Sequence, residues 1–263
     1  MQTVRTAPII GLIAQVALLA ALAHTAGLSV IGWSVGILCA VAMNAILTRA
    51  LARSRATAFG PANWVTLARS SLVIAVAALV ADAFVQSSSL TAIVTLTVVA
   101  LFLDSIDGQV ARRTASATGL GARFDMEVDA FLIVILSSYV AHSLGLWVLS
   151  IGAARYAFVA AGWLLPWLRE CPPPRFWYKL IAAIQGIVLT IAVADILPRA
   201  VNVALVMLAL VLLSESFVHE VRWLRQHAAM SPGHGAMSPG HGATPRQIVL
   251  VCAEARPAVG VSE

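Results

Sequence analysis

The chain is 263 residues long, with 60% hydrophobic and only 11% charged residues, and its formal net charge is +5. A soluble domain carries about 25% charged residues, so this composition excludes both a soluble fold and a disordered chain. The three cysteines, Cys39, Cys171 and Cys252, lack metal-ligand spacing and exclude a disulfide-stapled secreted domain. The sequence therefore predicts an integral membrane protein.

Eight apolar segments follow one another along the chain. A helix that crosses a bilayer needs roughly 20 mostly apolar residues. By that measure we expect spans at about 8–27, 29–48, 64–86, 90–107, 125–146, 147–167, 179–197 and 200–218. The first segment has no small-residue cleavage site and is followed by a second span, so we interpret it as a retained helix. The pattern predicts an all-α membrane protein.

Basic residues mark alternate links between these segments. They stand before the first span and in every second link, at Arg5, Arg49, Arg53, Arg55, Arg112, Arg113, Arg123, Arg169, Arg175, Lys179, Arg222 and Arg225, whereas the other links hold only Arg199. By the positive-inside rule, both termini and the arginine-rich links face the cytoplasm of a multi-pass cell-membrane protein. Because the basic residues form no single stripe, we expect no nucleic-acid partner.

Four of the six aspartates lie close together at one of these cytoplasmic links. Asp104 and Asp107 are three residues apart, and Asp125 and Asp129 are four apart, so each pair shares one face of a helix. The short polar connection at residues 113–120 predicts that the two helices are antiparallel neighbours. Four carboxylates would then converge at the cytoplasmic ends of two spans.

Four carboxylates beside a membrane would repel one another and lose hydration. Divalent cations such as Mg²⁺ or Mn²⁺ remove both problems, since they prefer oxygen ligands and bridging phosphates. The alternative is a set of solvated helix ends paired with Arg112, Arg113 and Arg123. Nearby residues favour a ligand site, because Gly108 leaves the backbone open to a ligand and the Arg112 guanidinium can bind a phosphate.

The complete pattern reads Asp104-x2-Asp107-Gly108-x2-Ala111-Arg112-x8-Gly121-x3-Asp125-x3-Asp129. It resembles, without a departure, the signature of the CDP-alcohol phosphotransferases. The segment at residues 61–69, with Pro61, Thr66 and Arg69, also looks like the opening of the first core helix in many members. The resemblance extends over roughly residues 60–220 and implies a six-helix membrane core.

This resemblance divides the chain into three parts. Two extra N-terminal transmembrane helices would occupy residues 1–55, and the catalytic core residues 56–223. A flexible cytoplasmic tail is expected at residues 224–263, where the sequence Ala-Met-Ser-Pro-Gly-His-Gly occurs twice in tandem.

The resemblance also implies an activity and a set of site residues. Similar enzymes move a phosphatidyl-type group from a CDP-alcohol, often CDP-diacylglycerol, to an acceptor hydroxyl and release CMP in phospholipid biosynthesis. Two divalent ions, Mg²⁺ or Mn²⁺, would be held by Asp104, Asp107, Asp125 and Asp129, with Asp129 also the general base. The cytidine diphosphate would lie against Thr66, Gly108, Ala111, Arg112 and Gly121. We also expect the protein to form a homodimer. Membrane lipid is expected as a further partner.

The acceptor is less well defined by the sequence. Arg69 and Arg155 are candidates to bind an anionic acceptor, and each could equally be a snorkelling anchor. Glycerol phosphate or another polyol phosphate is the expected acceptor. Ala130 stands where phosphatidylglycerophosphate synthases commonly carry a lysine, so inositol phosphate, serine and other polyols stay open.

Two other classes of membrane protein use paired carboxylates. Aspartate-rich prenyltransferases are expected to carry their two motifs in separate halves of the chain, whereas only 17 residues separate Asp107 from Asp125 here. Transporters hold intramembrane carboxylates near the midplane. The acids of this chain instead adjoin an arginine-rich cytoplasmic link, which favours phosphate chemistry over both alternatives.

Overall fold

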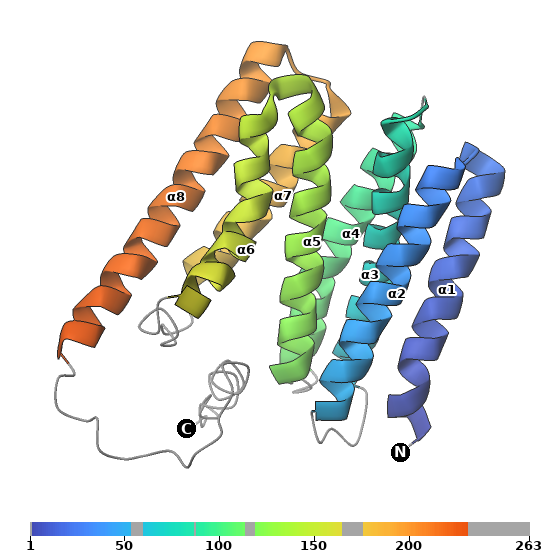
Figure 1. Ribbon diagram of the computed structural model, residues 1–263, viewed down its shortest axis with the longest axis horizontal. Coiled ribbons are helices and arrows are strands. Elements are labelled where there is room, and N and C mark those ends of the chain that lie inside the picture. Colours follow the sequence, from blue (N-terminus) through green and yellow to red (C-terminus); the bar gives the residue numbers. More distant parts are fainter. Residues whose placement is uncertain (1, 54–59, 87, 114–118, 165–175, 231–263) are drawn as a thin grey trace.

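The computed structural model describes residues 2–53, 60–86, 88–113, 119–164 and 176–230, and in these residues it contains helices and no strand (Figure 1). The helices are α1 (Gln2–Ala26), α2 (Val30–Arg53), α3 (Pro61–Ala83), α4 (Leu90–Arg113), α5 (Gly119–Leu144), α6 (Leu149–Leu164), α7 (Phe176–Ala194) and α8 (Arg199–Met230). A short 3₁₀ turn, Leu146–Val148, joins α5 to α6. The prediction of an all-α protein is confirmed.

Each predicted apolar segment forms one helix, with differences at the ends. Helix α5 begins at Gly119, several residues before the predicted start, so the second aspartate pair lies within its first turns rather than at its tip. Helix α8 continues to Met230 and includes residues that the sequence assigned to the tail. Both helices extend past the apolar segment into polar residues. Backbone hydrogen bonds hold a helix together whatever its side chains, whereas burial in a membrane requires apolar side chains.

Four of the helices are long and apolar enough to cross a membrane. Their apolar parts are Thr6–Ala26, Val30–Ala52, Asn63–Ala83 and Arg199–His219. Helices α4 and α7 carry shorter apolar stretches, Leu90–Ile106 and Leu180–Ala194. The chain is thus an all-α membrane protein, and the topology of eight spans stays a prediction.

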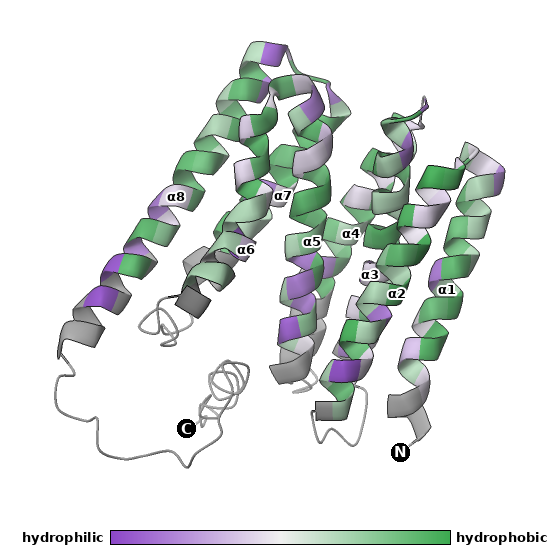
Figure 2. Cartoon of the chain, in the orientation of Figure 1, coloured by the Kyte–Doolittle hydropathy of each residue, from purple (hydrophilic) through white to green (hydrophobic). Residues whose placement is uncertain are grey.

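The two described ends of the chain lie at the same end of the bundle. The start of α1 and the end of α8 are both at the lower edge of Figure 1, as are the end of α2 and the start of α5. Hydrophilic residues gather at the lower ends of α5 and α8, beneath longer hydrophobic stretches (Figure 2). These helix ends adjoin links that the sequence assigns to the cytoplasm.

Helix α3 is the centre of the bundle. In its apolar part 72% of the residues are buried, against 17 to 33% in the other three candidate spans. It packs against α1, α2, α4 and α5. Small side chains such as Ala75, Ala77 and Ala78, all buried, allow helices to approach closely on several sides. Gly60 caps the helix and Pro61 occupies its first turn, where a missing N–H costs nothing.

The N-terminal pair α1–α2 is attached to α3 through polar contacts at two levels. In the interior, Asn44 Nδ2 donates to Gln15 Oε1 at 2.6 Å, and Gln15 Nε2 donates to Ser70 Oγ at 3.5 Å. Near the far end of α3, the Ser29 backbone N–H donates to Asp82 Oδ1 at 2.8 Å. These contacts make the pair an integral part of the packed bundle.

Helices α5 and α6 approach each other closely at Gly152. A Cβ at this position would lie 2.3 Å from Ser137 Oγ and 2.9 Å from the Cα of Val134. We expect Gly152→Ala to lower stability by about 1–3 kcal/mol, because backbone atoms of α5 cannot move aside as a side chain can. Thermal unfolding of the purified protein measures this. The control is Gly186→Ala, whose Cβ would have the Leu101 side chain as its nearest neighbour, with one terminal methyl at 2.9 Å. Equal losses in the two variants would contradict the expectation.

Candidate metal centre

Three of the four predicted metal ligands converge at the end of the bundle where α5 begins. One carboxylate oxygen from each of Asp104, Asp125 and Asp129 lies within 4.8 Å of the other two. Asp104 comes from α4, and the other two come from successive turns of α5. The burial of Phe124 and Val128 fixes the rotation of α5, so that the adjoining aspartates lie at the edge of the core and are about one third exposed.

A buried guanidinium lies among these carboxylates. Arg69 of α3 is only 1% exposed, and its Nη1 forms an ion pair with Asp104. Its Nη2 lies 2.5 Å from Asp125 Oδ1 and 2.9 Å from Asp129 Oδ1, and it donates to the Asp125 carbonyl oxygen at 3.1 Å. Two carboxylate oxygens within 4.8 Å of each other repel by about 3 kcal/mol or more at an effective dielectric constant of about 20. The guanidinium offsets this repulsion.

The way in which the acids meet differs from the sequence expectation. In the described residues, α4 and α5 make few or no direct contacts, and each packs instead against α3 and α7. The expectation that α4 and α5 are neighbours is therefore wrong. The short link at residues 113–120 constrains only the ends of the two helices and leaves room for a central helix between them. Arg69 joins the two sides because it lies on that central helix.

The remaining predicted site residues occupy several places. Thr66 is buried on α3, one turn before Arg69, and Gly121 lies in the first turn of α5, half-buried. The other four, Asp107, Gly108, Ala111 and Arg112, belong to the last turns of α4, and the surroundings of these residues lie outside the described part of the structure.

The two candidate acceptor residues lie in different surroundings. Arg69 is enclosed among the aspartates, a position that gives the acceptor role no support. Arg155 of α6 extends to Glu127 of α5, with 2.8 Å between Nη2 and Oε1, and both side chains remain partly exposed. Glu127 lies between Asp125 and Asp129 in sequence, so this ion pair adjoins the metal centre along α5.

The donor set suits a hard divalent cation. All three converging groups are carboxylates, the ligands that Mg²⁺ and Mn²⁺ prefer, and each is about one third exposed and so accessible to an ion from solvent. The triad could therefore bind a metal ion.

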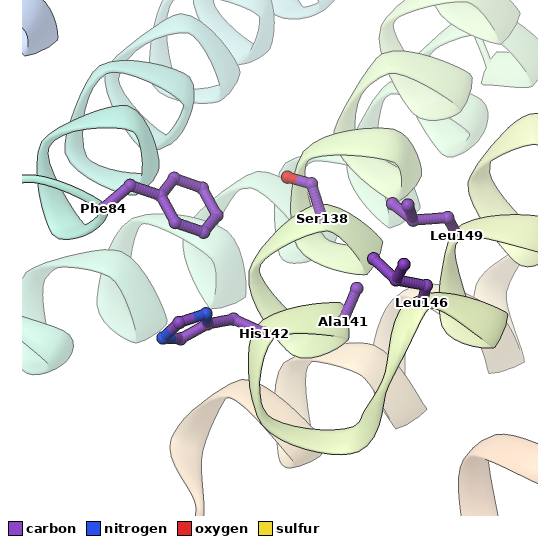
Figure 3. A pocket seen from close by; sticks show the side chains of 6 residues that line it. All are labelled: Phe84, Ser138, Ala141, His142, Leu146 and Leu149. Carbon is purple, nitrogen blue, oxygen red and sulfur yellow. The ribbon is translucent and has the colours of Figure 1, made fainter.

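A separate concavity of about 380 Å³ lies near the other end of α5 (Figure 3). It is lined by Phe84, Ser138, Ala141, His142, Leu146 and Leu149. The rings of Phe84 and His142 meet edge to face, with centroids 5.9 Å apart. His142 follows Asp129 by 13 residues, which is about 20 Å along a helix. This concavity is thus distinct from the metal centre.

Comparison with known proteins gives one family. The chain has no significant match among curated proteins or among solved structures. The sequence model of the family described as CDP-alcohol phosphatidyltransferase matches residues 59–215, which is more than half of the chain. The match begins just before α3 and contains the three converging aspartates and Arg69, while α1 and α2 precede it. The chain belongs to the CDP-alcohol phosphatidyltransferase family.

Proposed function

We propose that this protein transfers a phosphatidyl group from CDP-diacylglycerol to an acceptor hydroxyl and releases CMP, as a step of phospholipid biosynthesis. The family match supports phosphatidyl transfer in lipid synthesis. The observation that carries the proposal is the meeting of the Asp104, Asp125 and Asp129 carboxylates at the end of an apolar bundle. A lipid-linked diphosphate needs both parts: an apolar surface for its chains and a metal-binding carboxylate cluster for its phosphates.

In the proposed reaction, the acceptor oxygen bonds to the phosphorus that carries the lipid. The bond from that phosphorus to the bridging oxygen of CMP breaks, and the acceptor proton goes to the Asp129 carboxylate. Two Mg²⁺ or Mn²⁺ ions, when bound, would polarise the diphosphate and stabilise the departing CMP. Asp104, Asp107, Asp125 and Asp129 would hold them, while Thr66, Gly108, Ala111, Arg112 and Gly121 would line the nucleotide pocket.

For the acceptor we propose glycerol phosphate or another polyol phosphate. Arg155 supports this choice because it lies beside the aspartate helix and is partly exposed, with a guanidinium suited to a phosphate. An anionic acceptor would have to share Arg155 with Glu127, whose carboxylate holds it in the structure. We further propose that the protein works as a homodimer.

The direct test is release of CMP from CDP-diacylglycerol by the purified full chain. The reaction should depend on Mn²⁺ or Mg²⁺ and on one acceptor from a panel of glycerol phosphate, inositol phosphate, serine and uncharged polyols. A prenyltransferase would instead consume a prenyl diphosphate and leave CDP-diacylglycerol intact. A transporter would release no CMP with any acceptor, and either result would overturn the proposal.

The proposed active site faces the cytoplasm of a multi-pass cell-membrane protein. In a background lacking the three native cysteines, we expect an impermeant thiol reagent added outside the cell to label Ile196→Cys and not Arg225→Cys. Ile196, 80% exposed, lies in the turn between α7 and α8, and Arg225 is exposed near the opposite end of α8. The reverse labelling would place the metal centre outside.

A further inference from the structure

The geometry points to Arg69 as a built-in cation that holds the metal ligands together before metal binds and that a divalent ion must displace. This inference rests on the metal centre of the proposed function. It goes beyond that function by assigning Arg69 the control of metal affinity. The role is one of positioning, since Arg69 acts through the aspartates that it contacts.

The first argument is that the guanidinium contacts two helices. Nη1 forms an ion pair with Asp104 on α4, while Nη2 contacts the side chains of Asp125 and Asp129 and the Asp125 carbonyl on α5. Since α4 and α5 make few or no direct contacts in the described residues, the arginine of α3 bridges the two parts of the ligand set. A planar fork of donors suits this task better than a single ammonium group.

The second argument is that the arginine contacts carboxylate oxygens that a metal ion could also bind. Nη2 lies within 3 Å of both Asp125 Oδ1 and Asp129 Oδ1. A divalent ion bound to those oxygens would repel the guanidinium, because both carry positive charge. We therefore expect metal binding to move Nη2 away from α5.

The third argument is burial. Arg69 is 1% exposed, so its charge is separated from bulk water and depends on the acids for compensation. The acids are about one third exposed and can exchange this partner for a metal ion from the aqueous side. Arg69 and the metal are thus alternative counter-ions, and each occupies the cluster at the expense of the other.

Removal of the competing charge should have opposite effects on two measurements. In Arg69→Gln we expect Mn²⁺ to bind about tenfold more tightly than in the wild type, because the ion displaces no cation. The same variant in chelator should unfold about 5 °C or more below the wild type, because its acids repel one another without compensation. Addition of Mn²⁺ should therefore raise its unfolding temperature by more than it raises that of the wild type.

The experiment uses the purified full chain in lipid nanodiscs, with Mn²⁺ titration followed by electron paramagnetic resonance and thermal unfolding followed by tryptophan fluorescence. Arg49→Gln is the matched control, since it removes an exposed arginine from α2 and should change neither the Mn²⁺ affinity nor the metal-induced shift. Arg69→Lys keeps the charge without the fork and should have an intermediate affinity. If Arg69→Gln does not fold, the test is the Mn²⁺ affinity of Arg69→Lys. An affinity of that variant equal to or weaker than that of the wild type overturns the inference.

The outcomes separate this inference from the proposed function. Wild-type binding of Mn²⁺ with equal or weaker binding by Arg69→Gln overturns the role of Arg69 and leaves the proposed activity intact. The inference is also overturned if Arg69→Gln unfolds below the wild type by the same amount with and without Mn²⁺, because that result indicates a loss of packing alone. Tighter binding by Arg69→Gln in a protein that releases no CMP would support the inference while the proposed function fails. No Mn²⁺ binding by the wild type or the variant would remove the metal centre and this inference with it.

Discussion

Replacement of Asp129 by asparagine is expected to lower phosphatidyl transfer by about 10²–10⁴-fold, the usual contribution of a general base. Asparagine keeps the shape of the side chain but cannot accept the acceptor proton. The loss should persist at saturating Mn²⁺, while CDP-diacylglycerol binding stays largely in place. The measurement is CMP release across a Mn²⁺ titration, with nucleotide binding measured separately.

The control for this variant is Glu127→Gln, which makes the matched change of carboxylate to amide at a position of α5 between Asp125 and Asp129. Its carboxylate pairs with Arg155 and not with the aspartate cluster, so Mn²⁺ affinity should stay at the wild-type value. Normal turnover of Asp129→Asn at saturating metal would show that another group takes the proton.

Asp104→Asn should lower Mn²⁺ affinity and turnover together, each by more than about tenfold, because α4 would lose a charged oxygen ligand from the cluster. Excess metal should restore part of the activity, in contrast to Asp129→Asn. The change also takes from Arg69 Nη1 its charged partner on α4, so stability in chelator should fall as well.

Two measurements check this second expectation: Mn²⁺ binding, and the concentration of Mn²⁺ needed for half-maximal CMP release. A normal metal requirement in Asp104→Asn would remove Asp104 from the ligand set. The Asp125–Asp129 pair on α5 would then be the main binding element.

The sequence predicted the helices well because a helix in a membrane requires a long run of apolar residues, which is visible in the sequence. Each apolar segment became one helix, and the differences fell at polar ends, such as the start of α5 at Gly119 and the extension of α8 to Met230. The sequence also predicted the convergence of Asp104 with Asp125 and Asp129, although the direct contact expected between their helices was wrong.

The packing order was not predictable in the same way. Apolar residues surround most of these helices, so their pattern does not indicate which neighbour each face contacts, and α3 between α4 and α5 went unrecognised. The role of Arg69 was missed for the same reason. One signal was present: an arginine inside the apolar segment 64–86 needs a charged partner in the membrane, and the aspartates were candidates.

The attachment of α1 and α2 to α3 has a consequence for biogenesis. Arg69 reaches the membrane before its partners do, since Asp104 and Asp129 follow it by 35 and 60 residues. An unpaired arginine costs about 2.5–3.5 kcal/mol at the centre of a newly inserted helix and less toward its ends, where Arg69 lies. During that interval the two preceding helices are already present, and Gln15, which accepts a hydrogen bond from Asn44, offers a polar contact to Ser70, the residue next to Arg69. The N-terminal hairpin thereby gives α3 a place to dock during synthesis, before the acids that neutralise its charge have been translated.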